Sequence, residues 1–455
     1  MSAIAQFLHH SGYCVSGSDR ALTLPENEPV IGSLRSAGIK LYPQDGSFIK
    51  ECTPDLIVYS TAIEDDNPDF AVAPDIPGMH RAEVLNECIR SVSDKISVAV
   101  AGSCGKTSVT AWITETLFNA GLDPMMMGGG LSRRFISPGL AGNFRPGGGD
   151  FFVFEADESD KSLLNYAPDF AIILNMEEDH YSMEELTATF RQFVRNVKRG
   201  IAVSENVYNI LGADLFRNIP TWIFSGTGTV KIPGAAAQWQ MQSYCSGNAV
   251  FAEASGTGRT EITLPSPGRH TALNALSVLC TMHMLGLRDT VSIACIEDFH
   301  GVRRRFEYMG KNHAGAEIYD DYAHNVGKIV SCIQTAKECG KKIIAVFQPH
   351  GFKPLELMRD SLFTALEKTL SPDDTFCFLP VYYAGGTTSF SPRSEEVVSR
   401  YSTDGTGRYL FFSDRANAYE YINATSSADC IILVMGARDS SLSIFASHLA
   451  CGNPE

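Results

Sequence analysis

The sequence carries little positive charge for its size. Its 455 residues include 37 Lys and Arg against 52 Asp and Glu, which gives a net charge of −15. A general nucleic-acid-binding protein usually presents a basic surface, so this balance argues against that class. It leaves room for a nucleotide site, because a few Lys and Arg residues can act locally.

Long apolar runs and paired cysteines are also missing. No stretch approaches the roughly 18 apolar residues that span a bilayer, and the first residues lack the basic region and apolar core of a signal peptide. The twelve cysteines form no C-x-x-C pair, which disfavours a zinc site and is typical of reduced thiols. There is no internal repeat or low-complexity tract. We therefore expect a cytoplasmic protein with neither a membrane nor a nucleic acid as its partner.

Three blocks of alternating strands and helices follow one another. This agrees with the length of the chain, which is typical of about three domains. We place an N-terminal domain at residues 1–93, a central domain at 94–299 and a C-terminal domain at 300–455. Apolar runs that end in polar residues are typical of buried parallel strands, so we predict an α/β protein with ligand groups at strand ends. The stretch 226–262, rich in Gly, Ser, Gln and Thr, indicates short antiparallel strands or an inserted sheet.

The first block begins in the middle of a βαβ unit. Ile4, Phe7 and Leu8 have helical spacing, Gly12 can end that helix, and residues 13–16 indicate a short strand. A Rossmann-like domain normally places a strand and a Gly-rich turn ahead of such a helix. We expect that this first strand is lacking because the sequence starts at an internal Met.

The strongest local signal is a phosphate-binding loop between a strand and a helix. The strand at 96–101 runs into "GSCGKTS" and then into a helical stretch. In such a loop, backbone N–H groups surround phosphate, the lysine reaches the β- and γ-phosphates and the hydroxyl residue holds Mg²⁺. A strict Walker A motif has Gly at the position of Val100, so this is a shorter variant; the alternative is a Gly-rich turn without a ligand. The predicted nucleotide-binding residues here are Gly102, Ser103, Gly105, Lys106, Thr107 and Ser108.

Acidic residues follow the next two predicted strands. The sequences "VFEADESD" and "ILNMEEDHYS" bring Glu155, Asp157 and Glu158, and then His180, to strand ends. Adjacent parallel strands would direct these groups to the crevice that holds the triphosphate, where oxygen ligands suit Mg²⁺. The alternative for each cluster alone is a solvated acidic face.

Further polar groups occur in the last block. The basic triplet in "GVRRRFE" can clamp phosphate or form a surface run. "IYDDYAHN" and "FQPHGFKP" place acidic, aromatic and histidine side chains after two more strands.

Taken in this order, the motifs resemble those of the Mur ligases, the ATP-dependent amide-forming enzymes of peptidoglycan synthesis. The similar segments span nearly the whole chain and are "SGYCVSGSD", "VYSTAIEDDNP", "GSCGKTS", "EADESD", "LNMEEDH", "PGRH", "GVRRRFE", "DDYAHN", "FQPH" and "LPVYYAGG". The alanine-adding branch is the most similar. The resemblance implies a Rossmann-like UDP-sugar domain, a central P-loop-type ATPase domain and a Rossmann-like C-terminal domain that brings the amino acid. It implies formation of an acyl phosphate on UDP-N-acetylmuramate, then of an amide with L-alanine, by a monomer or weak homodimer.

The resemblance also implies roles for individual residues. It makes Lys106, Glu155, His180, Arg305 and Asp321 catalytic, with Thr107, Glu155 and His180 as Mg²⁺ ligands and Asn274 and Arg305 at the nucleotide. It assigns the amino acid to Tyr322, His324 and His350, and we expect Lys353 to act beside them as a point charge. Asp19 ends the second strand, where a Rossmann-like domain places its ribose ligand, so we assign the UDP-sugar to Asp19 and to the flanking Ser16 and Ser18.

Four positions depart from the family pattern. Thr271 stands where Asn is usual, Cys104 replaces a His and Val326 replaces a Pro. After "FQPH" the alanine-adding enzymes carry two arginines, whereas this chain has Gly351 and Pro354. A neutral residue cannot replace a bidentate guanidinium without loss.

Two alternatives to an alanine-adding ligase stay open: a Mur-like ligase with another acceptor or amino acid, and a non-catalytic nucleotide-binding paralogue. We also expect that the chain as written binds a UDP-sugar poorly and keeps its ATP site, and that an added in-frame strand and Gly-rich turn restores acceptor affinity.

Overall fold

The computed structural model describes residues 1–60, 63, 66–158, 161–178, 181–226, 232–256, 258–383, 390–402 and 407–452. Contacts divide the chain into two compact units. The first comprises Met1–Pro265 with Thr271–Arg303, and the second comprises Ser266–His270 with Arg304–Glu455. None of the described helices is long and apolar enough to cross a membrane.

The N-terminal part of the first unit holds four short strands. Its elements are α1 (Ser2–His10), β1 (Ser16–Ser18), α2 (Glu28–Ser36), β2 (Lys40–Tyr42), β3 (Ile57–Tyr59), α3 (Pro68–Ala71), β4 (Gly78–His80) and α4 (Arg81–Ser91). The strands form two separate parallel pairs, β1 with β2 and β3 with β4. The strand predicted at 13–16 begins three residues later than expected, because only residues 16–18 pair with β2 and Tyr13 is 64% exposed.

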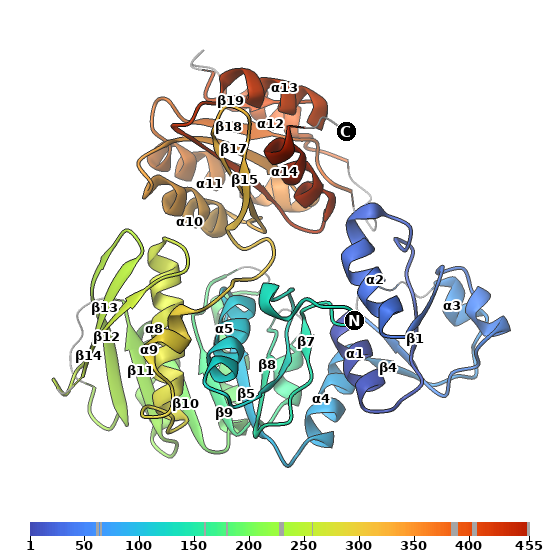
Figure 1. Cartoon of the computed structure of the whole chain (residues 1–455), viewed down its shortest axis with the longest axis vertical. Helices are drawn as coiled ribbons and strands as arrows, with labels where there is room; N and C mark the ends of the chain where they lie inside the picture. Colours follow the sequence, from blue (N-terminus) through green and yellow to red (C-terminus); the bar gives the residue numbers. More distant parts are fainter. Residues whose placement is uncertain are drawn as a thin grey trace. The chain divides into compact units, whose positions relative to one another are not determined.

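The rest of the first unit is built on one ten-stranded sheet (Figure 1). Its strands are β5 (Ile96–Ala101), β6 (Met125–Met127), β7 (Phe144–Arg145), β8 (Phe151–Glu155), β9 (Phe170–Ile173), β10 (Gly200–Ser204), β11 (Thr221–Ser225), β12 (Ala237–Cys245), β13 (Asn248–Glu253) and β14 (Arg259–Thr263). Their order is β14-β13-β12-β11-β10-β9-β5-β8-β6-β7, and β5 lies parallel to both β8 and β9.

The antiparallel strands predicted in 226–262 are present. They are not an independent inserted sheet, because β12 pairs in parallel with β11 and so extends the same sheet.

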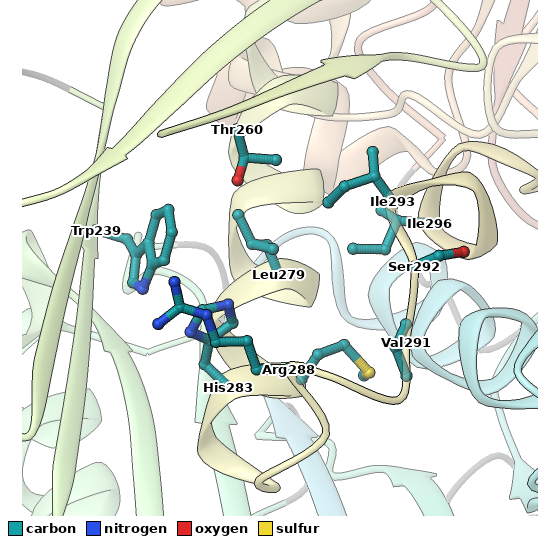
Figure 2. Close-up of a pocket in the computed structure, with 10 residues that line it drawn as sticks. Trp239, Thr260, Leu279, His283, Arg288, Val291, Ser292, Ile293 and Ile296 are labelled. Carbon is teal, nitrogen blue, oxygen red and sulfur yellow. The ribbon is translucent and has the colours of Figure 1, made fainter. Parts of the chain in front are cut away.

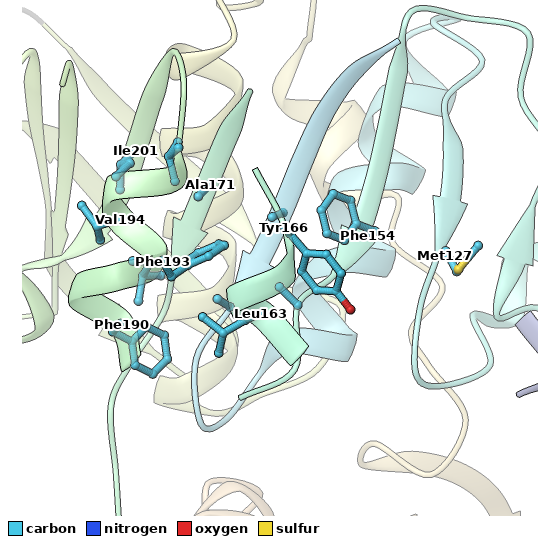
Figure 3. Packing of buried hydrophobic residues seen from close by; sticks show 14 of the residues in the cluster. Met127, Phe154, Leu163, Tyr166, Ala171, Phe190, Phe193, Val194 and Ile201 are labelled. Atoms are coloured by element: carbon cyan, nitrogen blue, oxygen red, sulfur yellow. The ribbon is translucent and has the colours of Figure 1, made fainter. Parts of the chain in front are cut away.

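Helices cover both faces of this sheet. They are α5 (Lys106–Asn119), α6 (Met183–Asn196), α7 (Glu205–Leu211), α8 (Arg269–Met284) and α9 (Ile293–Glu297). Phe154, Phe190 and Phe193 belong to the core on one side, which Figure 3 shows. Trp112 of α5 and Leu276 of α8 belong to the core on the other. The parallel strands β5, β8, β9 and β10 are buried on both faces, which explains why their sequences are mostly apolar runs.

The second unit contains a six-stranded sheet of order β15-β16-β20-β17-β18-β19. Its elements are β15 (Glu307–Lys311), β16 (Glu317–Asp321), α10 (Val326–Lys337), β17 (Lys342–Gln348), α11 (Phe352–Thr369), β18 (Thr375–Phe378), α12 (Ser394–Tyr401), β19 (Tyr409–Phe411), α13 (Arg415–Thr425), β20 (Cys430–Gly436) and α14 (Ser441–Cys451). All neighbouring strands are parallel except β15 and β16. The ends of β16, β20 and β17 therefore meet at one edge.

Candidate active site

The predicted phosphate loop joins β5 to α5. Gly102 and Gly105 have φ values of +138° and +87°, a region that disfavours side chains. A Cβ on Gly102 would lie 3.2 Å from the backbone N of Asn175, so the close approach of the loop to the end of β9 also requires glycine. α5 begins at Lys106 with no side-chain cap on its first N–H groups. Such a helix start can receive phosphate oxygens.

Residues after β9 fasten the loop. Asn175 accepts a hydrogen bond from the Cys104 backbone N (2.8 Å) and donates one to the Cys104 carbonyl (3.0 Å). The Ser103 hydroxyl donates to the Glu177 carbonyl (3.1 Å) and accepts from the Glu177 backbone N (3.0 Å). The loop is therefore shaped before any ligand binds. The predictions did not include Asn175, whose only sequence signal is its place at a strand end.

Oxygen atoms that could hold a cation lie close together beside the loop. The Thr107 hydroxyl, on a residue 8% exposed, donates to Glu155 Oε2 at 3.0 Å. The same carboxylate oxygen accepts from the backbone N of Gly129 at 2.9 Å, and a Cβ on Gly129 would lie 2.9 Å from it. Two of the three predicted Mg²⁺ ligands are thus brought together, and hard oxygen donors fit that ion. His180, the third, lies outside the described residues.

Lys106 is enclosed by carboxylates. Its Nζ lies 2.6 Å from Glu158 Oε2 and 3.5 Å from Asp157 Oδ1, and it donates to the Gly102 carbonyl at 2.8 Å. Burial alone would lower the pKa of Lys106, but Glu158, Asp157 and Glu155 outweigh it and raise that pKa. Burial also raises the pKa of Glu158, and the Lys106 ammonium offsets only part of this effect. A role for Glu158 beside Lys106 was not predicted.

Other predicted residues of the first unit occupy two places. Asn274, on α8, lies against the loop, because its Oδ1 is 3.0 Å from the position of a Cβ on Gly105. Ser108 is half-buried in the first turn of α5. The UDP-sugar candidates belong to the β1 region, where Ser18 donates to Asp69, Ser16 donates to Cys52 at 3.9 Å and Asp19 is exposed.

In the second unit, Asp321 closes β16 and orders the following turn. Its carboxylate accepts from the backbone N of Phe306 and of Ala323, both at 2.7 Å. Burial raises the pKa of Asp321 to about 6, although the Arg305 charge and these two donors oppose the shift. The exposed Arg305 has its guanidinium carbon 5.0 Å from the centre of the Tyr322 ring. Arg303 of the same triplet belongs to the first unit.

Aromatic rings extend this cluster across the strand ends. The His324 ring centre lies 5.5 Å from that of Tyr322 and 5.0 Å from that of His350, which follows β17. Lys353 does not join them: its side chain is 74% exposed and pairs with Glu356 on its own helix at 3.8 Å. The predicted amino-acid residues are therefore brought together with the exception of Lys353.

A cavity of about 240 Å³ lies elsewhere in the first unit, between the antiparallel strands and helices α8 and α9 (Figure 2). It is lined by Trp239, Thr260, Leu279, Met282, His283, Arg288, Val291, Ser292, Ile293 and Ile296. None of the predicted site residues lines it, so it is separate from the phosphate loop.

A phosphate loop that follows a strand with parallel neighbours on both sides, with oxygen donors and a buried lysine beside it, defines a P-loop nucleotide-binding protein. Family models of the Mur ligases match three parts of the chain: the Mur ligase family catalytic domain at residues 1–92, the middle domain at 100–282 and the glutamate ligase domain at 304–438.

Individual relatives agree with these matches. The UDP-N-acetylmuramate–L-alanine ligase of Symbiobacterium thermophilum is 31% identical over 96% of this chain and 90% of its own. The enzyme of that name from Rhodopseudomonas palustris is 35% identical over 85% of this chain and 81% of its own. The crystal structure of UDP-N-acetylmuramate–alanine ligase from Thermotoga maritima has a TM-score of 0.77 at 25% identity and covers 99% of this chain and 96% of that one.

The chain therefore belongs to the Mur ligase family, which confirms the resemblance and the three-domain α/β fold class. The domain boundaries after residues 93 and 299 and the roles of the site residues stay predictions.

Proposed function

We propose that this protein joins L-alanine to the carboxylate of UDP-N-acetylmuramate at the expense of ATP, as a step of peptidoglycan synthesis. The observation that carries the proposal is the 31–35% identity, over most of the chain, to enzymes named for that reaction. Because the reaction consumes ATP and a UDP-sugar, we place it in the cytoplasm.

The proposed chemistry has two balanced steps. A carboxylate oxygen of the acceptor attacks the γ-phosphorus of ATP, the bond to the β-γ bridging oxygen breaks, and ADP leaves. The resulting acyl phosphate is then attacked by the neutral amine of alanine. The C–O bond to phosphate breaks, the amine loses a proton, and an amide and inorganic phosphate result.

The residues around the loop support the first step mainly by charge and position. The Lys106 ammonium, held over the loop by the Gly102 carbonyl and Glu158, can offset negative charge on the transferred phosphoryl group. The first N–H groups of α5, which receive no side-chain cap from the described residues, can bind phosphate oxygens. Thr107 and Glu155 would hold Mg²⁺, which supplies further charge neutralisation when bound.

The second unit supports delivery of the amine. The Asp321 carboxylate accepts hydrogen bonds from the backbone N of Phe306 and of Ala323, and these bonds fix the backbone next to Arg305 and Tyr322. The neighbouring rings of Tyr322, His324 and His350 offer a partly apolar site for a small amino acid at the strand ends.

The test measures phosphate release by the purified chain with ATP, Mg²⁺, UDP-N-acetylmuramate and each of the twenty amino acids. We expect release that depends on both the acceptor and L-alanine, together with a product of the mass of the amide. Release with another acceptor or amino acid instead would favour the alternative of a divergent Mur-like ligase. An absence of release with every amino acid would refute the proposal.

A further inference from the structure

Arg438 has an unusual backbone conformation at the end of a central strand. It follows β20, which lies between β16 and β17 and is parallel to both. Its φ is +65°, in the left-handed region where a residue with a Cβ is uncommon. Such a conformation costs free energy, and residues held in it cluster at functional sites.

The position of Arg438 puts it beside the predicted amino-acid residues. Its backbone N approaches the Tyr322 hydroxyl to 3.4 Å. The Tyr322 ring contacts that of His324, which in turn contacts that of His350. Arg438 is thus at the same edge of the sheet as the ends of β16 and β17.

Two neighbouring arginines at this edge of the sheet already make hydrogen bonds within the protein. Arg415 donates to Asp439 (2.6 Å), to Gln348 (3.0 Å) and to the hydroxyl of Ser441 (2.7 Å). Arg304 donates to the Gly436 carbonyl at 2.7 Å.

Arg305 lies over the Tyr322 ring, and Lys353 pairs with Glu356. Arg438 is exposed, and within the described ranges its guanidinium makes no hydrogen bond or ion pair. It is therefore a cationic fork on an ordered turn that is available to an anionic ligand. A guanidinium binds a carboxylate through two parallel hydrogen bonds, with more geometric selectivity than an ammonium.

We propose that Arg438 binds the α-carboxylate of the incoming amino acid and so determines that the enzyme uses amino acids rather than other small amines. This inference rests on the proposed function. The ligand is small, because it must fit beside the rings of Tyr322, His324 and His350 at the strand ends. Its carboxylate faces Arg438, and its amine points away from Arg438 toward the acyl phosphate.

The experiment compares the wild-type chain with Arg438→Gly, Arg438→Lys and the control Lys368→Ala, which removes an exposed cation from the last turn of α11. Glycine adopts the required φ without strain, so Arg438→Gly keeps the turn. Each variant is assayed with L-alanine and with L-alaninamide, which has the same amine but no carboxylate, and the KM for ATP is measured in parallel.

We expect Arg438→Gly to raise the KM for L-alanine about 10- to 100-fold, the range for losing charge-assisted hydrogen bonds. The KM for ATP and the activity with L-alaninamide should change less than about threefold, so that the preference for alanine over alaninamide collapses. The KM of Arg438→Lys for L-alanine should lie between those of the wild type and Arg438→Gly, and Lys368→Ala should keep the wild-type preference for alanine over alaninamide.

An unchanged preference in Arg438→Gly, or a rise in the KM for ATP in place of alanine, would overturn the assignment while the proposed function stands. A wild-type chain that releases no phosphate with any amino acid would overturn the proposed function, and the assignment of Arg438 with it.

Discussion

The pair formed by Lys106 and Glu158 allows a quantitative prediction. Their charged atoms are 2.6 Å apart, and the two side chains are only 11% and 8% exposed. At an effective dielectric constant of about 20, the attraction is roughly 6 kcal/mol, most of which offsets the desolvation of the two charges. Removal of one partner of a buried pair typically costs about 3–5 kcal/mol, since the other charge is left buried without compensation.

We therefore expect Lys106→Met to lower the free energy of unfolding by about 3 kcal/mol in the absence of nucleotide. The lower end of the range applies because burial already raises the pKa of Glu158, and this carboxyl can take up a proton when Lys106 is lost. The loss should be smaller at pH 5 than at pH 8. The pKa of Glu158 is higher in the folded than in the unfolded chain. Stability is therefore lost as the pH rises from the unfolded-state pKa through the folded-state pKa, because Glu158 then ionises while buried.

The assay is urea unfolding followed by tryptophan fluorescence. All three tryptophans of the chain, at positions 112, 222 and 239, belong to the first unit and its ten-stranded sheet or α5. The signal therefore reports that region even if the chain does not unfold in a single step. Glu158→Gln and the double variant Lys106→Met/Glu158→Gln complete the cycle.

The double variant should lose about 2 kcal/mol less than the sum of the two single losses, because it leaves neither charge buried alone. Losses that add within about 0.5 kcal/mol would refute the conclusion that this pair is coupled.

Three further predictions concern the cation site and the second unit. Glu155→Gln should raise the Mg²⁺ concentration needed for half-maximal activity about 10- to 100-fold, because a ligand beside Thr107 loses its charge; an unchanged Mg²⁺ dependence would remove Glu155 from the site. Gly129→Ala should have an effect in the same direction, since its Cβ would lie 2.9 Å from Glu155 Oε2, whereas the matched control Gly128→Ala has its nearest neighbour at 3.9 Å and should behave like wild type. Because burial raises the pKa of Asp321 to about 6, the contribution of Asp321 to stability should be lost as the pH rises from about 4 to 6. Hydrogen exchange gives the stability of the second unit in the wild type and in Asp321→Asn, and the difference between the two should fall over this pH range. A difference that does not change with pH would contradict the prediction.

The parts of the site that could be predicted from the sequence are local ones. The phosphate loop is a continuous segment whose glycines, lysine and threonine act on one ligand, so its pattern indicates its structure directly. The place of Asp321 and Tyr322 at the end of an apolar run was likewise predicted, whereas their roles were implied by the resemblance to the Mur ligases. Parallel strands bring such ends to one edge, which makes the position informative even without the fold.

The parts that could not be predicted depend on contacts between distant segments. The support of the loop by Asn175 and of Glu155 by Gly129 joins residues 71 and 26 positions apart. The Lys106–Glu158 pair spans 52 positions and lies within an acidic run that resembles a solvated face. Similarly, composition indicated antiparallel strands at 226–262 but could not reveal that β12 pairs with β11.

Activation of the acceptor carboxylate as an acyl phosphate can be followed with an oxygen label. UDP-N-acetylmuramate whose carboxylate carries ¹⁸O in both oxygens is incubated with the chain, ATP, Mg²⁺ and L-alanine. We expect one ¹⁸O in inorganic phosphate for each amide formed, because the oxygen that attacks the γ-phosphorus leaves with the phosphate. Amide formation with unlabelled phosphate would rule out the acyl phosphate.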